Sequence, residues 1–508
     1  MRIAAIVVGL AAVAAADRRW LLVAQREHYV PGSATRFALR WWRIGPNRVL
    51  GAAAVIGVVL SPLTPVVALI AALAVAVGPF GFPLRPRAPG PMVWTPRART
   101  VAAVTVALQA VVAAAAVLLG AGPPVAAAIA LISPLAVDAV LAALQPLEAR
   151  RAAPFVERAR ERLRAVHPTV VAITGSYGKT TTKMYAAHLM APARRVVPSP
   201  RSFNNRAGLS RAVNEHLTPG TEVFIAEMGT YGRGEIAELV EWVQPQVSAI
   251  TAIGPVHLER FGSEDEIVRA KSEIFAGART AVLNVDNDRL AALAERLTGI
   301  DVVRCSSRDA AADVAAIDEG GRLVVRRSGV VVGEAPLPDA PLENIAVAAA
   351  LAFAVGVPPE AVASALPTLP PVANRQSLER LSTGALAVDD TFNSNPAGCR
   401  AALSTLCRHA TAGAKRVVVT PGMVELGPVQ PAENRVWGAL AARAATDLVV
   451  VGLTNRRALL AGAAEVPPEE RAHLVVVDRH EHAVAWVRAH TAAGDVVLYE
   501  NQLPDHYP

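Results

Sequence analysis

Gly175, Gly178, Lys179 and Thr180 form a short loop whose residue types suit phosphate chemistry. The apolar, β-branched run over 169–174 precedes this loop, which predicts a buried parallel strand, a turn and a helix start. The glycines would turn backbone N–H groups inward, and the helix would add its positive N-terminal end. Lys179 would then contact the β- and γ-phosphates and the Thr180 hydroxyl would reach Mg²⁺, so the segment predicts an ATP site.

Three further polar residues follow strands that the pattern predicts. Glu227 ends a strand over 222–227, His257 follows one over 247–253, and Lys271 comes shortly afterwards. Ligand-binding residues of open α/β sheets gather at the carboxyl ends of strands, so these three could face the phosphate loop. Taken singly, each has a commoner explanation as a surface carboxylate, a hydrogen-bonded core histidine or a solvated lysine.

The elements that position these residues begin with an apolar and basic N-terminal third. Hydrophobic residues make up 53% of the 508, which favours membrane segments. Residues 1–167 hold 18 arginines, no lysine and 6 acidic residues. The arginines lie among apolar spans without a nucleic-acid-binding motif, so we expect anionic membrane lipid as their partner and no nucleic acid.

Residues 1–147 are predicted to form a transmembrane helical region. The apolar run over 3–16 is either a short first span, which is favoured, or a signal peptide. A second apolar run, 49–78, is interrupted at 61–65. This break predicts a helical hairpin, which would keep the arginine-rich loops on both sides of it, including 79–100, on the same face of the membrane.

Two complete spans are expected at 101–119 and 124–144. Asp138 lies in the second span, where it is either an intramembrane functional residue or an interfacial one. Alternating arginine and glutamate over 148–167 predicts a linker helix. The positive-inside tendency then places the chain in the cell membrane, with the rest of the chain on the cytoplasmic face.

From residue 168 onward, strand and helix patterns alternate, which predicts parallel α/β sheets. A proline-rich hinge at 369–371 divides a central P-loop domain, 168–371, from a Rossmann-like C-terminal domain, 372–508. The three cysteines lack metal-ligand spacing and indicate reduced thiols. The expected strands are 169–174, 222–227, 247–253, 280–285, 385–389, 416–420, 447–451, 474–477 and 495–499.

The motifs, taken in order, resemble those of the Mur ligase family, whose members are ATP-dependent amide-forming ligases. Within that family the pattern is nearest to the branch that adds D-alanyl-D-alanine. The resemblance covers about residues 170–500, and an ordered series of motifs is more specific than any one of them. The motifs are 175–183, 202–208, 227–229, 253–259, 270–273, 343–350, 374–375 and 389–396.

The resemblance implies that the γ-phosphate of ATP activates a carboxylate as an acyl phosphate, which an amine then attacks. Such phosphoryl transfer depends mainly on positioning and charge stabilisation. Catalytic roles are implied for Lys179, Lys271, His257 and Arg375. Of these, Lys179 would hold the γ-phosphate, and Arg375 would reach the phosphates from the C-terminal domain as it closes.

A metal site is implied as well. Thr180 and Glu227 would hold one Mg²⁺, while His257 and Lys271 would help to hold a second. Lys271 would be carbamylated by CO₂, which converts a cation into a carboxylate-like ligand. This modification would explain a lysine at a metal site, where an ammonium group would repel the ion.

The nucleotide and the acid substrate also have implied contacts. Asn344 would lie at the adenine, and Asp389 or Asp390 at the ribose. Asn204 and Asn205 lie where the family binds its acid, although an Asx turn would also explain them. Phe392 would lie against the base, and is equally well explained as a core aromatic. The full nucleotide-binding set is Gly175, Ser176, Gly178, Lys179, Thr180, Thr181, Asn344, Arg375, Asp389, Asp390 and Phe392.

Two departures from the family pattern bear on the substrates. Membrane spans stand in place of the soluble N-terminal domain that grips a UDP-sugar, which favours an acid held at the membrane, lipid-linked or polymeric. The Lys-Gly-Ser motif near the family's C-terminus, which helps to bind the amine, is absent, so the amine stays open. Glu500 and Asp505 could recognise an ammonium group, or could belong to a solvated tail.

The leading hypothesis is a membrane-anchored ligase that adds an amino acid or small peptide to a cell-envelope precursor, in cell-wall peptidoglycan synthesis. A poly-γ-glutamate-type synthase is the alternative within enzymes. A nucleotide-regulated membrane transport or scaffold protein is the alternative from another class, but we find no ABC-type signature. Whether a membrane protein partner takes part stays open.

Overall fold

The computed structural model divides into two compact units: an N-terminal unit, Met1–Arg151 with Leu503–Pro508, and an α/β unit, Ala152–Gln502. The final segment, predicted to belong to the C-terminal domain, thus packs with the N-terminal unit. The residues that the structure describes are 2–61, 64–82, 91–120, 124–200, 203–372, 377–392 and 394–508.

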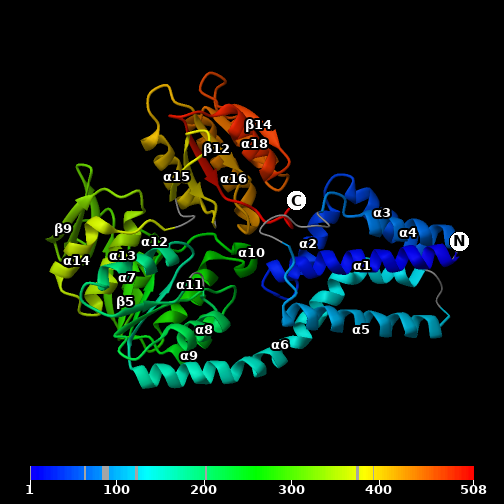
Figure 1. The fold of residues 1–508 in the computed structure, drawn as a ribbon, viewed down its shortest axis with the longest axis horizontal. Helices are drawn as coiled ribbons and strands as arrows, with labels where there is room; N and C mark the ends of the chain where they lie inside the picture. The colour runs from blue at the N-terminus through cyan, green and yellow to red at the C-terminus, as the bar shows by residue number, and fades with distance from the viewer. Residues whose placement is uncertain are drawn as a thin grey trace. The chain divides into compact units, whose positions relative to one another are not determined.

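The N-terminal unit is helical (Figure 1). The first predicted span, 3–16, is part of a longer helix, α1. The last predicted span and the predicted linker helix form one continuous helix, α6, which continues through Pro146. As predicted, this helix ends before His167. The helices are α1 (Arg2–Arg26), α2 (Ser33–Trp42), α3 (Asn47–Leu60), α4 (Pro65–Val77), α5 (Pro96–Leu118) and α6 (Pro124–Val166).

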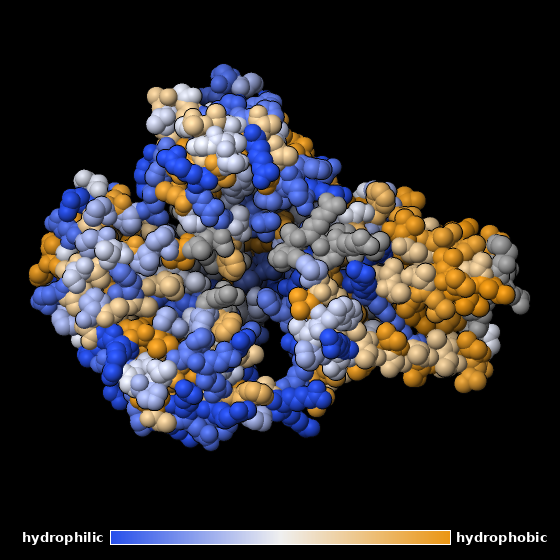
Figure 2. Space-filling view, viewed as in Figure 1, coloured by the Kyte–Doolittle hydropathy of each residue, from blue (hydrophilic) through white to orange (hydrophobic). Residues whose placement is uncertain are grey.

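Apolar side chains gather on the surface of this helical unit, over α1, α3, α4 and α5 (Figure 2). Among the described residues, α5 and α6 are long and apolar enough to cross a membrane. A third such span results if α2 and α3, which meet at a 108° bend, count as one. The predicted spans at 101–119 and 124–144 correspond to α5 and the first part of α6.

The predicted hairpin over 49–78 corresponds to α3 and α4, which pack on each other around a break at 61–64. The close approach of α3 and α4 depends on small residues. A Cβ added to Gly57 of α3 would lie 2.8 Å from the Cβ of Ala71 of α4. The part of the arginine-rich loop that holds Arg85 and Arg87 lies outside the described residues.

Two buried charged residues bind helix ends within the N-terminal unit. Asp138 of α6 accepts hydrogen bonds from the backbone N–H groups of Ala34 and Thr35 at the start of α2, at 3.2 and 2.8 Å. Arg19 of α1 donates to the carbonyls of Ala76 and Gly78 at the end of α4, at 3.1 and 2.5 Å. Helix ends leave such groups unpaired, so Asp138 has a structural role in the fold.

The last residues of the chain also pack in this unit. The indole N–H of Trp41 donates to the carbonyl of His506 at 2.9 Å, and the ring of Phe37 meets the Tyr507 ring edge-on at 4.9 Å. His506 is buried and pairs with the buried Glu27 at 3.0 Å. The segment that holds Asp505 is therefore packed and is not a solvated tail.

The central half of the α/β unit, 168–372, holds one sheet in the order β2-β3-β1-β4-β5-β6-β7-β8-β9. Its strands pair in parallel as far as β7, and β7, β8 and β9 extend it as an antiparallel meander. The strands are β1 (Thr169–Thr174), β2 (Val196–Pro198), β3 (Val223–Glu227), β4 (Val247–Ile250), β5 (Thr280–Asn284), β6 (Asp301–Ser306), β7 (Val314–Glu319), β8 (Arg322–Arg327) and β9 (Val330–Pro336).

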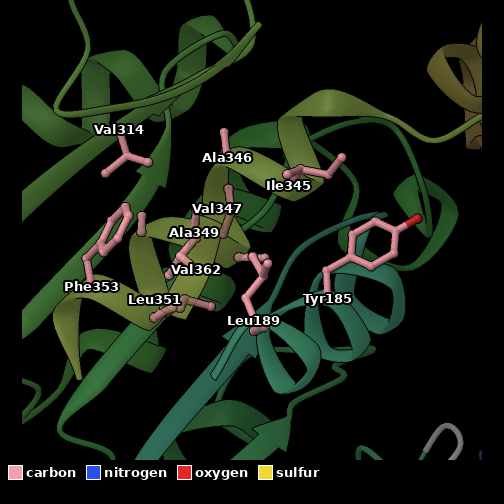
Figure 3. Packing of buried hydrophobic residues seen from close by; sticks show 14 of the residues in the cluster. Tyr185, Leu189, Val314, Ile345, Ala346, Val347, Ala349, Leu351, Phe353 and Val362 are labelled. Atoms are coloured by element: carbon pink, nitrogen blue, oxygen red, sulfur yellow. The ribbon is translucent and has the colours of Figure 1, made fainter. Parts of the chain in front are cut away.

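Helices cover this sheet, and α7 and α13 pack together over its largest apolar cluster. In that cluster Leu189 of α7 lies beside Val347 and Leu351 of α13, and Tyr185 of α7 lies nearer to Ile345 (Figure 3). The helical elements are α7 (Lys179–Met190), α8 (Arg206–His216), α9 (Glu235–Val243), α10 (Leu258–Phe261), α11 (Glu264–Ser272), η1 (Glu273–Phe275), α12 (Asp288–Arg296), α13 (Leu342–Ala354), α14 (Pro359–Ala365) and η2 (Leu366–Thr368).

The C-terminal half, 377–502, holds a second sheet in the order β10-β11-β15-β12-β13-β14. All its pairs are parallel except β10 with β11. Its elements are β10 (Ser377–Arg380), β11 (Leu386–Asp390), α15 (Pro396–His409), β12 (Arg416–Thr420), η3 (Gly427–Val429), α16 (Gln430–Ala444), β13 (Asp447–Val451), α17 (Arg456–Ala463), β14 (His473–Val477), α18 (His480–His490) and β15 (Val496–Glu500).

The prediction of mixed α/β domains with mainly parallel sheets is confirmed, and each expected strand is present within a few residues of its expected bounds. Strands β2, β6, β7, β8, β9 and β10 were not expected. Those of the meander pair through tight turns such as Gly320-Gly321, and the buried runs of β7 and β8 are only three residues long, which gives a weak apolar pattern.

Replacing Asp138 by alanine should lower the free energy of unfolding by about 1–3 kcal/mol, because it leaves buried N–H groups of α2 without an acceptor. Thermal unfolding of the full chain in mild detergent measures the change. Glu148→Ala on the same helix is the control, because that residue makes a more exposed ion pair with Arg97. Equal stability losses in the two variants would contradict the capping role.

Candidate active site

The predicted phosphate loop forms as expected between β1 and α7. Gly178 has φ +82°, and a Cβ there would lie 2.4 Å from Oδ1 of Asn344. A Cβ on Gly175 would lie 2.0 Å from the hydroxyl of Thr251, which follows β4. The loop is also bonded to the segment after β4, since the backbone N–H of Ser176 donates to the carbonyl of Ala252 at 2.8 Å. Neither glycine can therefore be replaced without moving the loop.

Lys179 and Lys271 meet at one backbone carbonyl. The Nζ atoms of Lys179 and Lys271 donate to the oxygen of Gly175 at 2.7 and 3.0 Å, respectively. Lys271 comes from α11 and is almost completely buried. Burial, with a smaller contribution from the charge of Lys179, holds the pKa of Lys271 well below its ordinary value. Lys271 therefore faces the phosphate loop, as its place in the sequence suggested, and its metal-binding role stays a prediction.

Glu227 lies at the end of β3 and gathers three polar partners. Its Oε2 accepts from the hydroxyl of Thr180 at 3.0 Å and from Nζ of Lys183 at 2.9 Å. Its Oε1 accepts from the side-chain amide of Asn204 at 3.3 Å. Parallel pairing of β1 with β3 brings Glu227 beside Ile173, at the edge where the phosphate loop begins.

Lys183 had no predicted role, although it ends the 175–183 motif. Its side chain is fully buried and forms an ion pair with Glu227, so it supplies the counter-charge for that carboxylate. The scarcity of lysine was the available signal. Of the four lysines in the chain, three lie at this site, and the fourth, Lys415, donates to a carbonyl of the C-terminal half.

His257 precedes α10 with a left-handed backbone, at φ +61°. Its Nδ1 makes a short hydrogen bond with Oε2 of Glu425, from the loop after β12. Burial lowers the pKa of His257, and the charges of Lys179 and Lys271 act in the same direction, while Glu425 opposes them. His257 therefore lies within electrostatic reach of both lysines of the phosphate loop.

Two of the predicted site asparagines, Asn344 and Asn205, make side-chain hydrogen bonds in the central half. Asn344, at the start of α13, is buried, and its Oδ1 accepts from the hydroxyl of Thr182 at 3.3 Å. It thus lies directly against the phosphate loop; its adenine contact stays a prediction. Asn205 caps α8, since its side chain accepts from the N–H of Gly208 at 2.9 Å. That cap matches the turn-forming alternative, and a substrate role for Asn205 stays a prediction.

The remaining predicted nucleotide residues belong to the C-terminal half. Asp389 and Asp390 end β11, and Oδ1 of Asp389 accepts from the N–H of Thr391 at 3.1 Å. Phe392 follows with 41% of its surface exposed, which disagrees with a core aromatic. Arg375, together with Asn374, lies outside the described residues.

The residues at the phosphate loop suit a divalent cation held together with a nucleotide. Thr180 and Glu227 present oxygen atoms to the same space, and Mg²⁺ is usually held by one or two such groups plus phosphates. Within the described residues, no group of three or more His, Cys, Asp or Glu could hold a metal by itself. Most of the coordination would then come from phosphates and water.

A phosphate loop, a carboxylate beside it and a second α/β domain fit an ATP-dependent enzyme, and the comparisons identify its class as ligases that form carbon–nitrogen bonds. Residues 173–352 match the Mur ligase middle domain, and residues 375–499 match the glutamate ligase domain of the Mur ligases. The chain belongs to the Mur ligase family.

Named relatives agree with this assignment. The chain is 35% identical over 436 residues to UDP-N-acetylmuramoyl-tripeptide–D-alanyl-D-alanine ligase of Mycobacterium tuberculosis, which covers 77% of this chain and 83% of that protein. The Escherichia coli protein of that name is 30% identical over 291 residues, covering 55% and 64%. A solved structure of MurF from Acinetobacter baumannii gives a TM-score of 0.61 at 25% identity, covering 69% of this chain and 77% of that one.

Replacing Lys183 by methionine should destabilise the protein by about 3–5 kcal/mol, because the Glu227 carboxylate stays buried without its counter-charge. Chemical denaturation of the full chain, followed by intrinsic fluorescence, measures the loss. Lys415→Met is the matched control, since that lysine is exposed and should change stability by less than about 0.5 kcal/mol. Native stability in Lys183→Met would show that the ion pair contributes nothing.

Proposed function

We propose that the protein is a membrane-anchored ligase that joins an amino acid or dipeptide amine to a carboxylate of a cell-envelope precursor. The observation that carries the proposal is the meeting of Lys179 and Lys271 at the carbonyl of Gly175, beside the paired Thr180 and Glu227. This is a phosphate site with a second buried lysine whose charge the ordinary ATP loop does not require.

The reaction needs a carboxylate made reactive at neutral pH. A carboxylate oxygen attacks the γ-phosphorus of ATP, the bond to ADP breaks, and an acyl phosphate forms. The amine then attacks the acyl carbon, loses a proton, and inorganic phosphate leaves with its electron pair. Lys179 and the loop N–H groups stabilise charge on the transferred group, while Lys183 holds the Glu227 side chain in place through their ion pair.

Lys271 enters this scheme as a carbamate. Its lowered pKa makes the neutral amine available, and a neutral amine adds to CO₂ with loss of one proton. The product is an anion, which the nearby ammonium group of Lys179 would attract. Carbamylated Lys271 and His257 would supply an oxygen and a nitrogen ligand for a second Mg²⁺, next to the one held by Thr180 and Glu227.

The acid substrate is proposed to be held at the membrane. The relatives are named for a UDP-linked muramoyl tripeptide and D-alanyl-D-alanine, which makes a peptidoglycan precursor the first acid to consider. The apolar helices α5 and α6 and the arginines of the N-terminal unit support a multi-pass anchor on the cell membrane. A lipid-linked form of such a precursor fits that anchor, with the α/β unit on the cytoplasmic face.

Release of ADP and phosphate by the full chain in lipid nanodiscs tests the ligase proposal. Turnover should require an acid and an amine together, and the lipid-linked precursor should exceed the UDP-linked one. Lys179→Ala should lose at least about 100-fold, because it removes a charge on the transferred group. Lys415→Ala should keep native turnover.

Two results would count against this proposal. Turnover that ignores every acid and amine pair, and that Lys179→Ala leaves unchanged, would refute the ligase proposal. If the protein instead forms a polymer and does so only with glutamate, the poly-γ-glutamate alternative would replace the proposal of a single addition.

Carbamylation of Lys271 can be observed without activity. Protein equilibrated with ¹³C-bicarbonate should show a carbamate carbon resonance, because a buried neutral amine adds CO₂. The resonance should vanish in Lys271→Arg and persist in Lys415→Arg, whose lysine is exposed. If the spectrum of the native protein has no carbamate signal, the modification is refuted and the ligase assignment stays in place.

A further inference from the structure

Glu425 comes from the C-terminal half and contacts the central half at a predicted site residue. It lies in the loop between β12 and η3, and its backbone is left-handed at φ +63°. His257, its hydrogen-bond partner, is left-handed too, at φ +61°. Non-glycine residues rarely adopt this conformation, and those that do gather at functional sites. Here two such residues contact each other.

The contact involves more than one hydrogen bond. Oε1 of Glu425 lies 3.7 Å from a guanidinium nitrogen of Arg260, and its backbone carbonyl accepts from the N–H of Glu259 at 3.3 Å. The chain is close enough that a Cβ on Gly427 would lie 3.1 Å from that same N–H group. The loop after β12 therefore contacts the segment that follows His257 at Glu259 and Arg260.

A second contact to the His257 ring comes from Tyr231 of the central half. The ring of Tyr231 meets His257 edge-on at 4.9 Å, and the guanidinium of Arg260 lies 4.5 Å above the Tyr231 ring. A histidine whose Nδ1 is engaged by a carboxylate offers its Nε2 to a ligand. Glu425 thus sets which ring nitrogen His257 presents.

Buried side-chain amides hold the loop that carries Glu425. Asn434 donates to the carbonyl of Met423 and accepts from its N–H, at 2.9 and 2.8 Å. Asn455 donates to the carbonyls of Pro421 and Met423 at 3.0 and 2.9 Å. Asn501, just past β15, donates to the carbonyl of Gly422 at 2.7 Å. A loop fixed this firmly can transmit the position of the C-terminal half to His257.

We propose that Glu425 is a positioning residue, which orients His257 only when the two halves of the α/β unit are together. Glu425 touches no reacting group, and acts through the ring and through the 257–260 segment. The inference deepens the proposed function, on which it rests, by naming the residue that links closure of the C-terminal half to completion of the site.

Steady-state kinetics of three variants test the proposal on the full chain. Glu425→Ala should lower kcat by about 10–100-fold, as loss of such a histidine partner does at other sites. KM for ATP should change less than about threefold, because the phosphate loop is untouched. Glu425→Gln keeps an acceptor for Nδ1–H and should recover most of kcat. Glu465→Gln, which removes an exposed ion pair in the same half, should match the native enzyme.

Hydrogen exchange of the full chain without nucleotide or metal gives a second readout. Backbone amides over 257–261 should exchange at least about tenfold faster in Glu425→Ala than in the native protein, with Glu425→Gln close to native. Native exchange rates and native kcat in Glu425→Ala would each overturn the proposal, as would equal losses in the Ala and Gln variants. If the native chain lacks ligase activity while the exchange result holds, the proposed function fails and the contact stands.

Discussion

The gathering of three lysine side chains at one turn of the chain is the constraint on which the site depends. Lys179, Lys183 and Lys271 lie around the Gly175 to Thr180 loop, and Glu227 is the carboxylate that pairs with one of them. Lys183 and Lys271 are buried and Lys179 is partly buried, and positive groups brought together in this way are costly unless an anion joins them. The phosphates of ATP would supply that anion, and carbamylation of Lys271 would add a second negative group, so ligand and modification would satisfy the same electrostatic need.

The parallel sheet brings these residues together. The order β3-β1-β4 places three strand ends at one edge: Glu227 ends β3, the phosphate loop follows β1, and Thr251 follows β4. Helix α11 then adds Lys271, and α13 adds Asn344 beside Gly178. Each side chain comes from a rigid element or its first residue beyond, which suits a reaction that depends on positioning.

Local sequence predicted what local physics controls. The phosphate loop, the strand end at Glu227 and the hairpin over 49–78 followed from residue type and periodicity. The partners of Lys183 and Glu425 did not, because an ion pair or hydrogen bond between distant segments leaves no periodic trace; Glu425 and His257 are 168 positions apart. For Asp138 the residue type was informative, because a carboxylate in an apolar helix indicates a specific role. Only the structure showed that this role is to cap α2.

The central claim is that the γ-phosphate passes to a carboxylate oxygen, and oxygen isotopes test it most directly. An acid that supports ADP release, labelled with ¹⁸O in its carboxylate, should transfer one labelled oxygen to inorganic phosphate as the amide forms. Mass spectrometry of the released phosphate measures this transfer. Labelled phosphate is the predicted result. Unlabelled phosphate, formed together with the amide, would contradict activation through an acyl phosphate.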